Sequence, residues 1–200
     1  MDYSLKICII RLMKILEGCK LIMAVVINGN GAVTGLTALP DSAMATGSVI
    51  QVVYASTSTE ASATTDTFID SNLTATITPI STSSKVFVII NQQTAQFHPS
   101  GGSNAVYGGI KLIRTVSSSD TTLHNPCANT GPFEVGGTGQ VTVRTNINIL
   151  DSPSTTSAVT YKTQIAAYDS ARGPFEAQFD ETGGSAIDGT SYITLMEVVG

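Results

Sequence analysis

Charged side chains are scarce in this 200-residue chain: Asp, Glu, Lys and Arg together make up 12% of it, about half of the usual share. Their balance is acidic, with a formal net charge of −5. From Met23 onward the chain holds 6 basic and 13 acidic side chains. A surface of this sign repels phosphate backbones, so we expect no nucleic-acid partner.

Cysteine, histidine and tryptophan are equally sparse, with three, two and no residues. The cysteines have no zinc-type spacing and form no disulfide framework. His98 and His124 lie in no motif that would hold a histidine between a carboxylate and an activated serine. His124 with Cys127 is a weak metal candidate. A second is the acidic group Glu176, Asp180, Glu181 and Asp188, whose spacing matches no calcium loop. We therefore expect no metal, no cofactor and no enzymatic activity.

Long uncharged apolar runs are missing as well, since no stretch approaches the roughly 18 residues of a membrane-spanning helix. We expect no membrane insertion. Residues 1–22 form a leader in which Leu5, Ile9 and Leu16 follow helical spacing among basic side chains. Two interpretations remain open: a short amphipathic helix, or a stretch that lies upstream of a translation start at Met23.

Serine and threonine fill the place of the missing charges and make up about a quarter of the chain. Threonine is β-branched and favours strands, and serine favours turns. Short alternating segments separated by Gly, Pro and Ser recur through the chain, which is typical of a sandwich or barrel. The sequence predicts an all-β protein: a β-sandwich or jelly-roll head over residues 47–200, preceded by an extended, anchoring arm over residues 23–46.

The clearest pattern runs from Gln140 to Tyr168. Val143, Ile147 and Ile149 alternate with polar residues, which is the period of a half-buried strand. After a turn at Asp151–Pro153 the alternation resumes through residues 158–169. Two alternating strands joined by a short polar loop predict an antiparallel hairpin.

Two further expectations concern the core and the loops. Lys85–Asn91 is apolar on both faces, which predicts a central strand covered on both sides. We expect Val88 and Ile147 to be buried on opposite sides of the core. The stretch from Val116 to Gly139 reads as one long loop, and loops of that length are often functional.

Aromatic side chains near loops are the candidate contact residues. Such residues commonly form sugar-stacking or protein-contact surfaces, although they also plug the ends of sandwiches. The candidates are Phe97, His98, Tyr107 and Phe133.

Four segments resemble the β-rich distal domain of tail-fibre-like proteins of tailed phages. They are Gly47–Val53 (GSVIQVV), Leu73–Lys85 with its Ile-Thr-Pro and Ser-Thr-Ser-Ser-Lys motifs, Leu150–Pro153 with Thr160–Lys162, and Ser191–Glu197 (SYITLME). The resemblance extends from Gly47 to Val199.

The resemblance implies a structural protein located on the virion and carries over no catalytic residue. It implies a tail-fibre-type appendage or tip that contacts the host surface, and a host cell-surface glycan is one conceivable ligand. A capsid decoration (cement) protein is the alternative, and a polysaccharide-degrading enzyme is a third reading. Low charge and strands that are apolar on both faces, together with the resemblance, predict a homotrimer that joins other virion proteins.

Overall fold

The computed structural model describes residues 26–27, 33–34, 44–98, 108–124, 139–168, 173–179 and 189–200. Most of these residues lie in strands, whose side chains alternate between two faces. These residues form strands and no helix, so the predicted all-β class is confirmed. The chain divides into two units, Met1–Ala43 and Met44–Gly200. In the first unit, β1 (Val26–Ile27) pairs antiparallel with β2 (Val33–Thr34).

The second unit contains ten strands among its described residues. They are β3 (Val49–Thr57), β4 (Ala61–Ala63), β5 (Ile69–Ile77), β6 (Lys85–His98), β7 (Gly108–Val116), β8 (Ser119–His124), β9 (Gly139–Asp151), β10 (Val159–Ala167), β11 (Phe175–Ala177) and β12 (Ser191–Val198). Local chemistry sets several of their ends. Pro79, which has no N–H to donate, lies two residues after the end of β5. Gly47 adopts a φ of 90° just before β3, a conformation that glycine reaches without strain.

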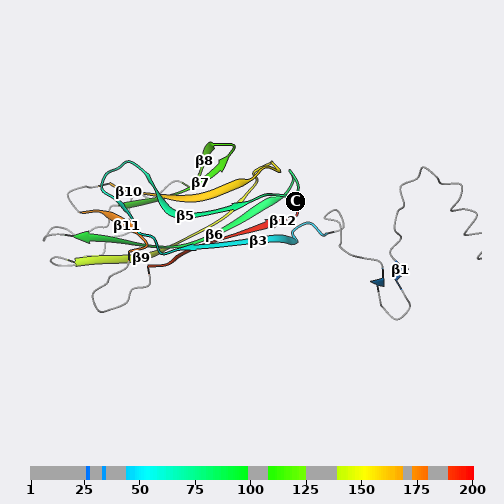
Figure 1. Ribbon diagram of the computed structural model, residues 1–200, viewed down its shortest axis with the longest axis horizontal. Coiled ribbons are helices and arrows are strands. Elements are labelled where there is room, and N and C mark those ends of the chain that lie inside the picture. Colours follow the sequence, from blue (N-terminus) through cyan, green and yellow to red (C-terminus); the bar gives the residue numbers. More distant parts are fainter. Residues whose placement is uncertain are drawn as a thin grey trace, which may run out of the picture. The chain divides into compact units, whose positions relative to one another are not determined.

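The strands form two antiparallel sheets that face one another (Figure 1). One sheet has the order β5-β10-β7-β8 and is called the β10 sheet below. The other, called the β6 sheet, has the order β3-β12-β6-β11-β4, with β9 pairing the free side of β6. The short strands β4 and β11 pair with each other and continue the β3–β12 ladder alongside β6.

The pairing is nested. The outermost strands of the domain, β3 and β12, pair with each other. Moving inward along the chain, β5 pairs with β10, β6 with β9, and β7 with β8. A long hairpin of four strand pairs, rolled up into two facing sheets, is a jelly roll, and this part of the predicted fold class is confirmed.

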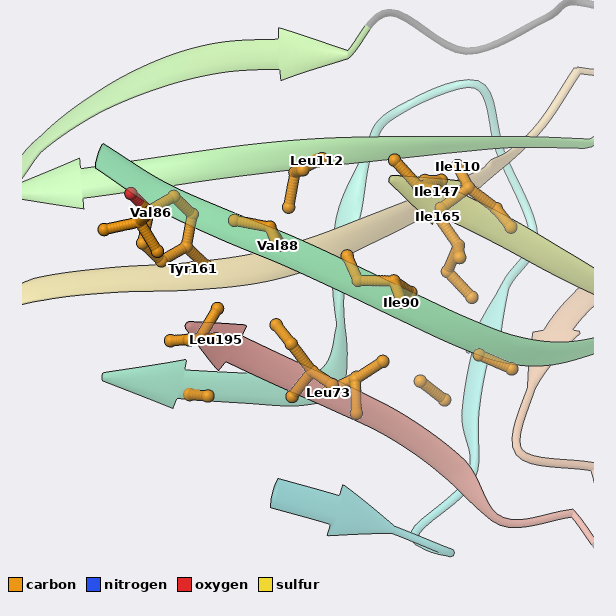
Figure 2. Packing of buried hydrophobic residues seen from close by; sticks show 14 of the residues in the cluster. Leu73, Val86, Val88, Ile90, Ile110, Leu112, Ile147, Tyr161, Ile165 and Leu195 are labelled. Carbon is orange, nitrogen blue, oxygen red and sulfur yellow. The ribbon is translucent and has the colours of Figure 1, made fainter. Parts of the chain in front are cut away.

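The core lies between the two sheets. Figure 2 shows Val86, Val88 and Ile90 of β6 among Leu112, Tyr161 and Ile165 of the β10 sheet. In β10 the residues that alternate onto one face, Tyr161, Thr163, Ile165 and Ala167, are all buried. The alternation therefore divided the faces of this strand correctly, and the structure shows which of them is inward.

The predicted hairpin from Gln140 to Tyr168 is wrong. Both strands exist, but β9 pairs with β6, whereas β10 pairs with β5 and β7 in the other sheet. Residues 152–158 lead from one sheet to the other. Alternation reports which face of a strand is buried and contains no information about its neighbour, so it could not reveal the crossing.

Two related expectations also need correction. Val88 and Ile147 are both buried, but they lie on the same face of adjacent strands, since Val88 pairs with Ile149 and Ile90 with Ile147. The stretch 116–139 is not one loop. It begins with a tight turn at Ser117 and Ser118, both at positive φ, followed by β8. Two-residue turns in which both residues have positive φ usually contain Asn or Gly. The Ser117–Ser118 pair therefore gave no hairpin signal in the sequence.

We expect Val88→Ala and Ile147→Ala each to lower the free energy of unfolding by about 2–4 kcal/mol, because each leaves a cavity in the core. Urea unfolding monitored by circular dichroism measures this loss. Thr142→Ala is the matched control, since Thr142 lies in the same strand but is exposed. A loss at Thr142 as large as at Ile147 would contradict the assigned inward face of β9.

Candidate functional site

The four predicted contact residues are not brought together by the described structure. Phe97 and His98 end β6, where their backbones pair with Gln140 and Gly139 of β9. Their side chains lie outside the described part of the chain, as do Tyr107 and Phe133 in full. Their role as contact residues therefore stays a prediction.

A buried polar cluster joins the two sheets. Arg114 of β7 donates from Nη1 to both carboxylate oxygens of Asp151, at 2.8 and 3.0 Å. The Tyr161 hydroxyl of β10 donates to Asp151 Oδ2 at 2.8 Å. Asp151 is the last residue of β9, so this carboxylate connects the β6 sheet to two strands of the β10 sheet. Because both of its oxygens are occupied and it is 8% exposed, we interpret the cluster as a structural bridge.

Tyr161 gives this bridge a testable pH dependence. Burial, and next the hydrogen bond to Asp151, raises the pKa of the Tyr161 hydroxyl far above its usual value of 10. The unfolded chain therefore loses the phenol proton first as the pH rises, and stability should fall above pH 10 by up to about 1.4 kcal/mol per pH unit. Below pH 10 this contribution to stability is fully present.

Tyr161→Phe should remove that increment of alkaline sensitivity. Urea unfolding of both proteins, at neutral pH and above pH 10, measures the difference. At neutral pH the variant should lose only about 1 kcal/mol, the net value of one hydrogen bond. Equal alkaline losses in the two proteins would show that Tyr161 is not the group responsible.

The outer face of the β10 sheet is polar, and three of its charged side chains form ion pairs. Lys162 Nζ lies 3.0 Å from Asp70 Oδ2 and 3.7 Å from Asp120 Oδ2. Gln164 also donates to Asp70. Partial burial acts to raise the pKa of Asp70, but the hydrogen bonds from Gln164 and Lys162 outweigh it and lower that pKa overall.

The two weak metal candidates fall largely outside the described residues. His124 ends β8, whereas Cys127, Asp180, Glu181 and Asp188 are not described. Glu176 lies in β11, where it accepts a hydrogen bond from Ser62. Among the residues that the structure describes, no three His, Cys, Asp or Glu side chains are grouped so as to hold a metal ion. The same residues include no helix that is long and apolar enough to cross a membrane.

The outer face of the β6 sheet differs from that of the β10 sheet because it is apolar. Neighbouring strands bring Val52, Met196, Phe87 and Leu150 into one row across the sheet. The next row contains Tyr54, Thr194, Ile89 and Asn148. Val52, Tyr54 and Leu150 are 57%, 60% and 53% exposed. We call these two rows, with the neighbouring Val49, Val198 and Tyr192, the apolar outer face.

The rings of Tyr54 and Tyr192 stack within this face, with centroids 6.1 Å apart and an interplanar angle of 27°. The half-buried Phe87 and Ile89 correct the expectation that β6 is covered on both sides: its Val86, Val88 and Ile90 face is buried, and the other is only half-buried. Antiparallel sheets normally present polar residues to solvent on their outer face. Apolar surface in that position marks an interaction site.

Charge is confined to the two ends of the apolar outer face. Lys85 pairs with Val198 at one end. At the other end Arg144 donates to Asn91 Oδ1 and to the Thr190 carbonyl. The described acidic residues are Glu60, Asp66, Asp70, Asp120, Asp151, Glu176 and Glu197. None of them belongs to the rows of this face, and Glu176 of β11 faces the same side of the sheet one row beyond Arg144.

The sequence contained one signal for this face, in the Val-Val-Tyr run of β3, which is apolar on both sides. Such a run also fits a strand buried within a sheet, so periodicity alone could not identify it as exposed. Comparison of the chain with protein-family models and with curated proteins finds no match.

Proposed function

We propose that this protein is a structural protein of a phage virion, a homotrimeric jelly roll displayed on the particle surface. Within the particle it forms part of a tail-fibre-type appendage or tip, where it joins other virion proteins and contacts the host surface, for example through a cell-surface glycan. It acts by assembly and binding and not as an enzyme.

The observation that carries the proposal is the apolar outer face on one sheet of a jelly roll. Capsid and lectin domains are among the proteins that use this fold. A face with exposed Val52, Tyr54 and Leu150 fits a protein that functions in contact with other subunits. The carboxylate that connects the two sheets, Asp151, is committed to the bridge with Arg114 and Tyr161, which fits a structural role.

The test is the protein content of purified particles. Quantitative mass spectrometry should detect the chain as a component of the virion, and an antibody against residues 47–200 should label the tail in electron micrographs. Labelling over the whole head at high copy number would replace the tail assignment with capsid decoration. Absence of the chain from purified particles would refute the proposal.

Removing residues 1–46 should separate folding from attachment. The shortened protein retains the hydrogen bond from Gly47 N to the Val199 carbonyl, 2.8 Å long, which ties the start of β3 to the end of β12. We expect a soluble, folded, trimeric domain that no longer joins the particle. Circular dichroism and light scattering measure the first result, and particle mass spectrometry the second. Incorporation at normal occupancy would place the anchor within the head domain.

A further inference from the structure

We infer that the apolar outer face of the β6 sheet is a contact between copies of this chain, so that its occupant is a second copy. This inference rests on the proposed homo-oligomer and identifies the surface that holds it together. The exposure, the charge and the hydrogen-bonding groups of the face support it.

The exposure of the face exceeds what an isolated domain requires. Six large apolar side chains of the described residues are exposed, and four of them, Val49, Val52, Tyr54 and Leu150, belong to this one surface. They lie along both margins of the sheet, on β3 and β9, with the half-buried Met196 and Phe87 between them. The apolar surface is therefore continuous across four strands, and single scattered side chains do not produce that pattern.

The distribution of charge favours a second copy over other occupants. The protein carries a net charge of −5, so two copies repel each other over most of their surfaces. The rows of the apolar outer face contain no carboxylate, and Glu176, which faces the same side of the sheet, lies one row beyond Arg144. When this face is the contact, the acidic surfaces of both copies remain in solvent. Two copies that meet through these rows therefore bring no carboxylates together.

The polar groups of the face can form hydrogen bonds with the same groups of a second copy. Asn91 and Asn146 are linked by a 2.7 Å hydrogen bond, and Asn148 is exposed in the next row. A side-chain amide both donates and accepts, so an amide can pair with an identical amide across a symmetry axis. A carboxylate or an ammonium group in that position would repel its copy. Neutral amides beside apolar rows therefore suit a symmetric assembly.

The test places a negative charge within the face. Val52→Glu and Tyr54→Glu alter side chains that are mostly exposed, so the domain should fold normally. In the assembly each glutamate would be desolvated without a partner. We expect either substitution to raise the dissociation constant of the oligomer at least about tenfold. Thr74→Glu is the matched control: Thr74 is an exposed strand residue on the outer face of the β10 sheet, and its replacement should leave association unchanged.

Sedimentation velocity over a range of micromolar concentrations measures the association, and circular dichroism verifies the fold of each variant. A dimer or trimer that dissociates in Val52→Glu but not in Thr74→Glu supports the inference. A monomeric wild-type protein, or variants that keep the oligomer intact, would overturn it. So would a monomer that associates only after removal of residues 1–46, because that segment would then be the occupant.

These outcomes are independent of the particle experiment. If the protein is found in virions but Val52→Glu does not change its association, the proposed function stands and this interface is refuted. If the oligomer dissociates in Val52→Glu but the protein is absent from virions, the interface stands and the proposed function is refuted.

Discussion

Asp151→Ala is expected to destabilise the domain by about 3–5 kcal/mol, the usual loss when one partner of a buried ion pair is removed. The substitution leaves the Arg114 guanidinium, whose Nε already has no partner, without its carboxylate. It also leaves the Tyr161 hydroxyl without an acceptor at a fully buried position. Because Asp151 connects the two sheets, its loss weakens the packing of one sheet on the other. Urea unfolding at neutral pH measures the loss.

Two variants bracket this result. Asp120→Ala also removes a carboxylate from an ion pair, in this case with Lys162. The Asp120 side chain is 49% exposed, so the loss of stability should stay below about 1 kcal/mol. Asp151→Asn keeps one acceptor and removes the charge, so its stability should fall between those of Asp151→Ala and the wild type. If Asp151→Ala behaved like Asp120→Ala, the bridge would contribute nothing.

Gln178→Ala should cost a comparable amount, about 3–5 kcal/mol, because several buried groups lose their partner together. Gln178 is fully buried just after β11, at a φ of 54°. With its amide oriented to satisfy its neighbours, the nitrogen lies 2.7 Å from the Ser71 carbonyl and 3.2 Å from that of Thr59. The amide oxygen then accepts from Gln92 Nε2 and Ser191 Oγ, at 3.3 and 2.9 Å.

Alanine shares the β-carbon of glutamine, so this substitution leaves the strain of the positive φ unchanged and isolates the side-chain amide. Gln164→Ala is the control, because that amide bonds only the exposed Asp70 and its loss should cost less than about 1 kcal/mol. Thermal unfolding of the two variants side by side gives the comparison. Equal melting temperatures would mean that water replaces the Gln178 amide without loss.

Gln178 also shows where inference from sequence stops. Alternation predicted the all-β class and the division of β10 into two faces, because the strand period follows directly from backbone geometry. A glutamine in a stretch rich in glycine and acidic residues has the pattern of a surface loop. Its burial depends on Ser71 and Ser191, which are distant in sequence, and no local pattern contains that contact.

The pairing of strands and the candidate site were missed for a related reason. β9 and β10 are neighbours in sequence, yet their partners are set by contacts with β6, β5 and β7. The outer face of the β6 sheet likewise becomes continuous only when β3, β12, β6 and β9 lie side by side. The sequence predicted contact residues among aromatic side chains near loops, whereas the apolar surface of the described structure lies on strands.

The nested pairing has a consequence for biosynthesis. β3 is the first described strand of the domain to be made, and its ladder partner β12 is the last. The apolar residues of β3 must therefore wait, unpaired, until β12 has been made. Among the described strand pairs of this domain, only the short β7–β8 hairpin can close from local contacts, and the remaining pairs span progressively longer stretches of chain, which slows folding. The outermost strands thus close last, and β3 remains open to premature association in the interval.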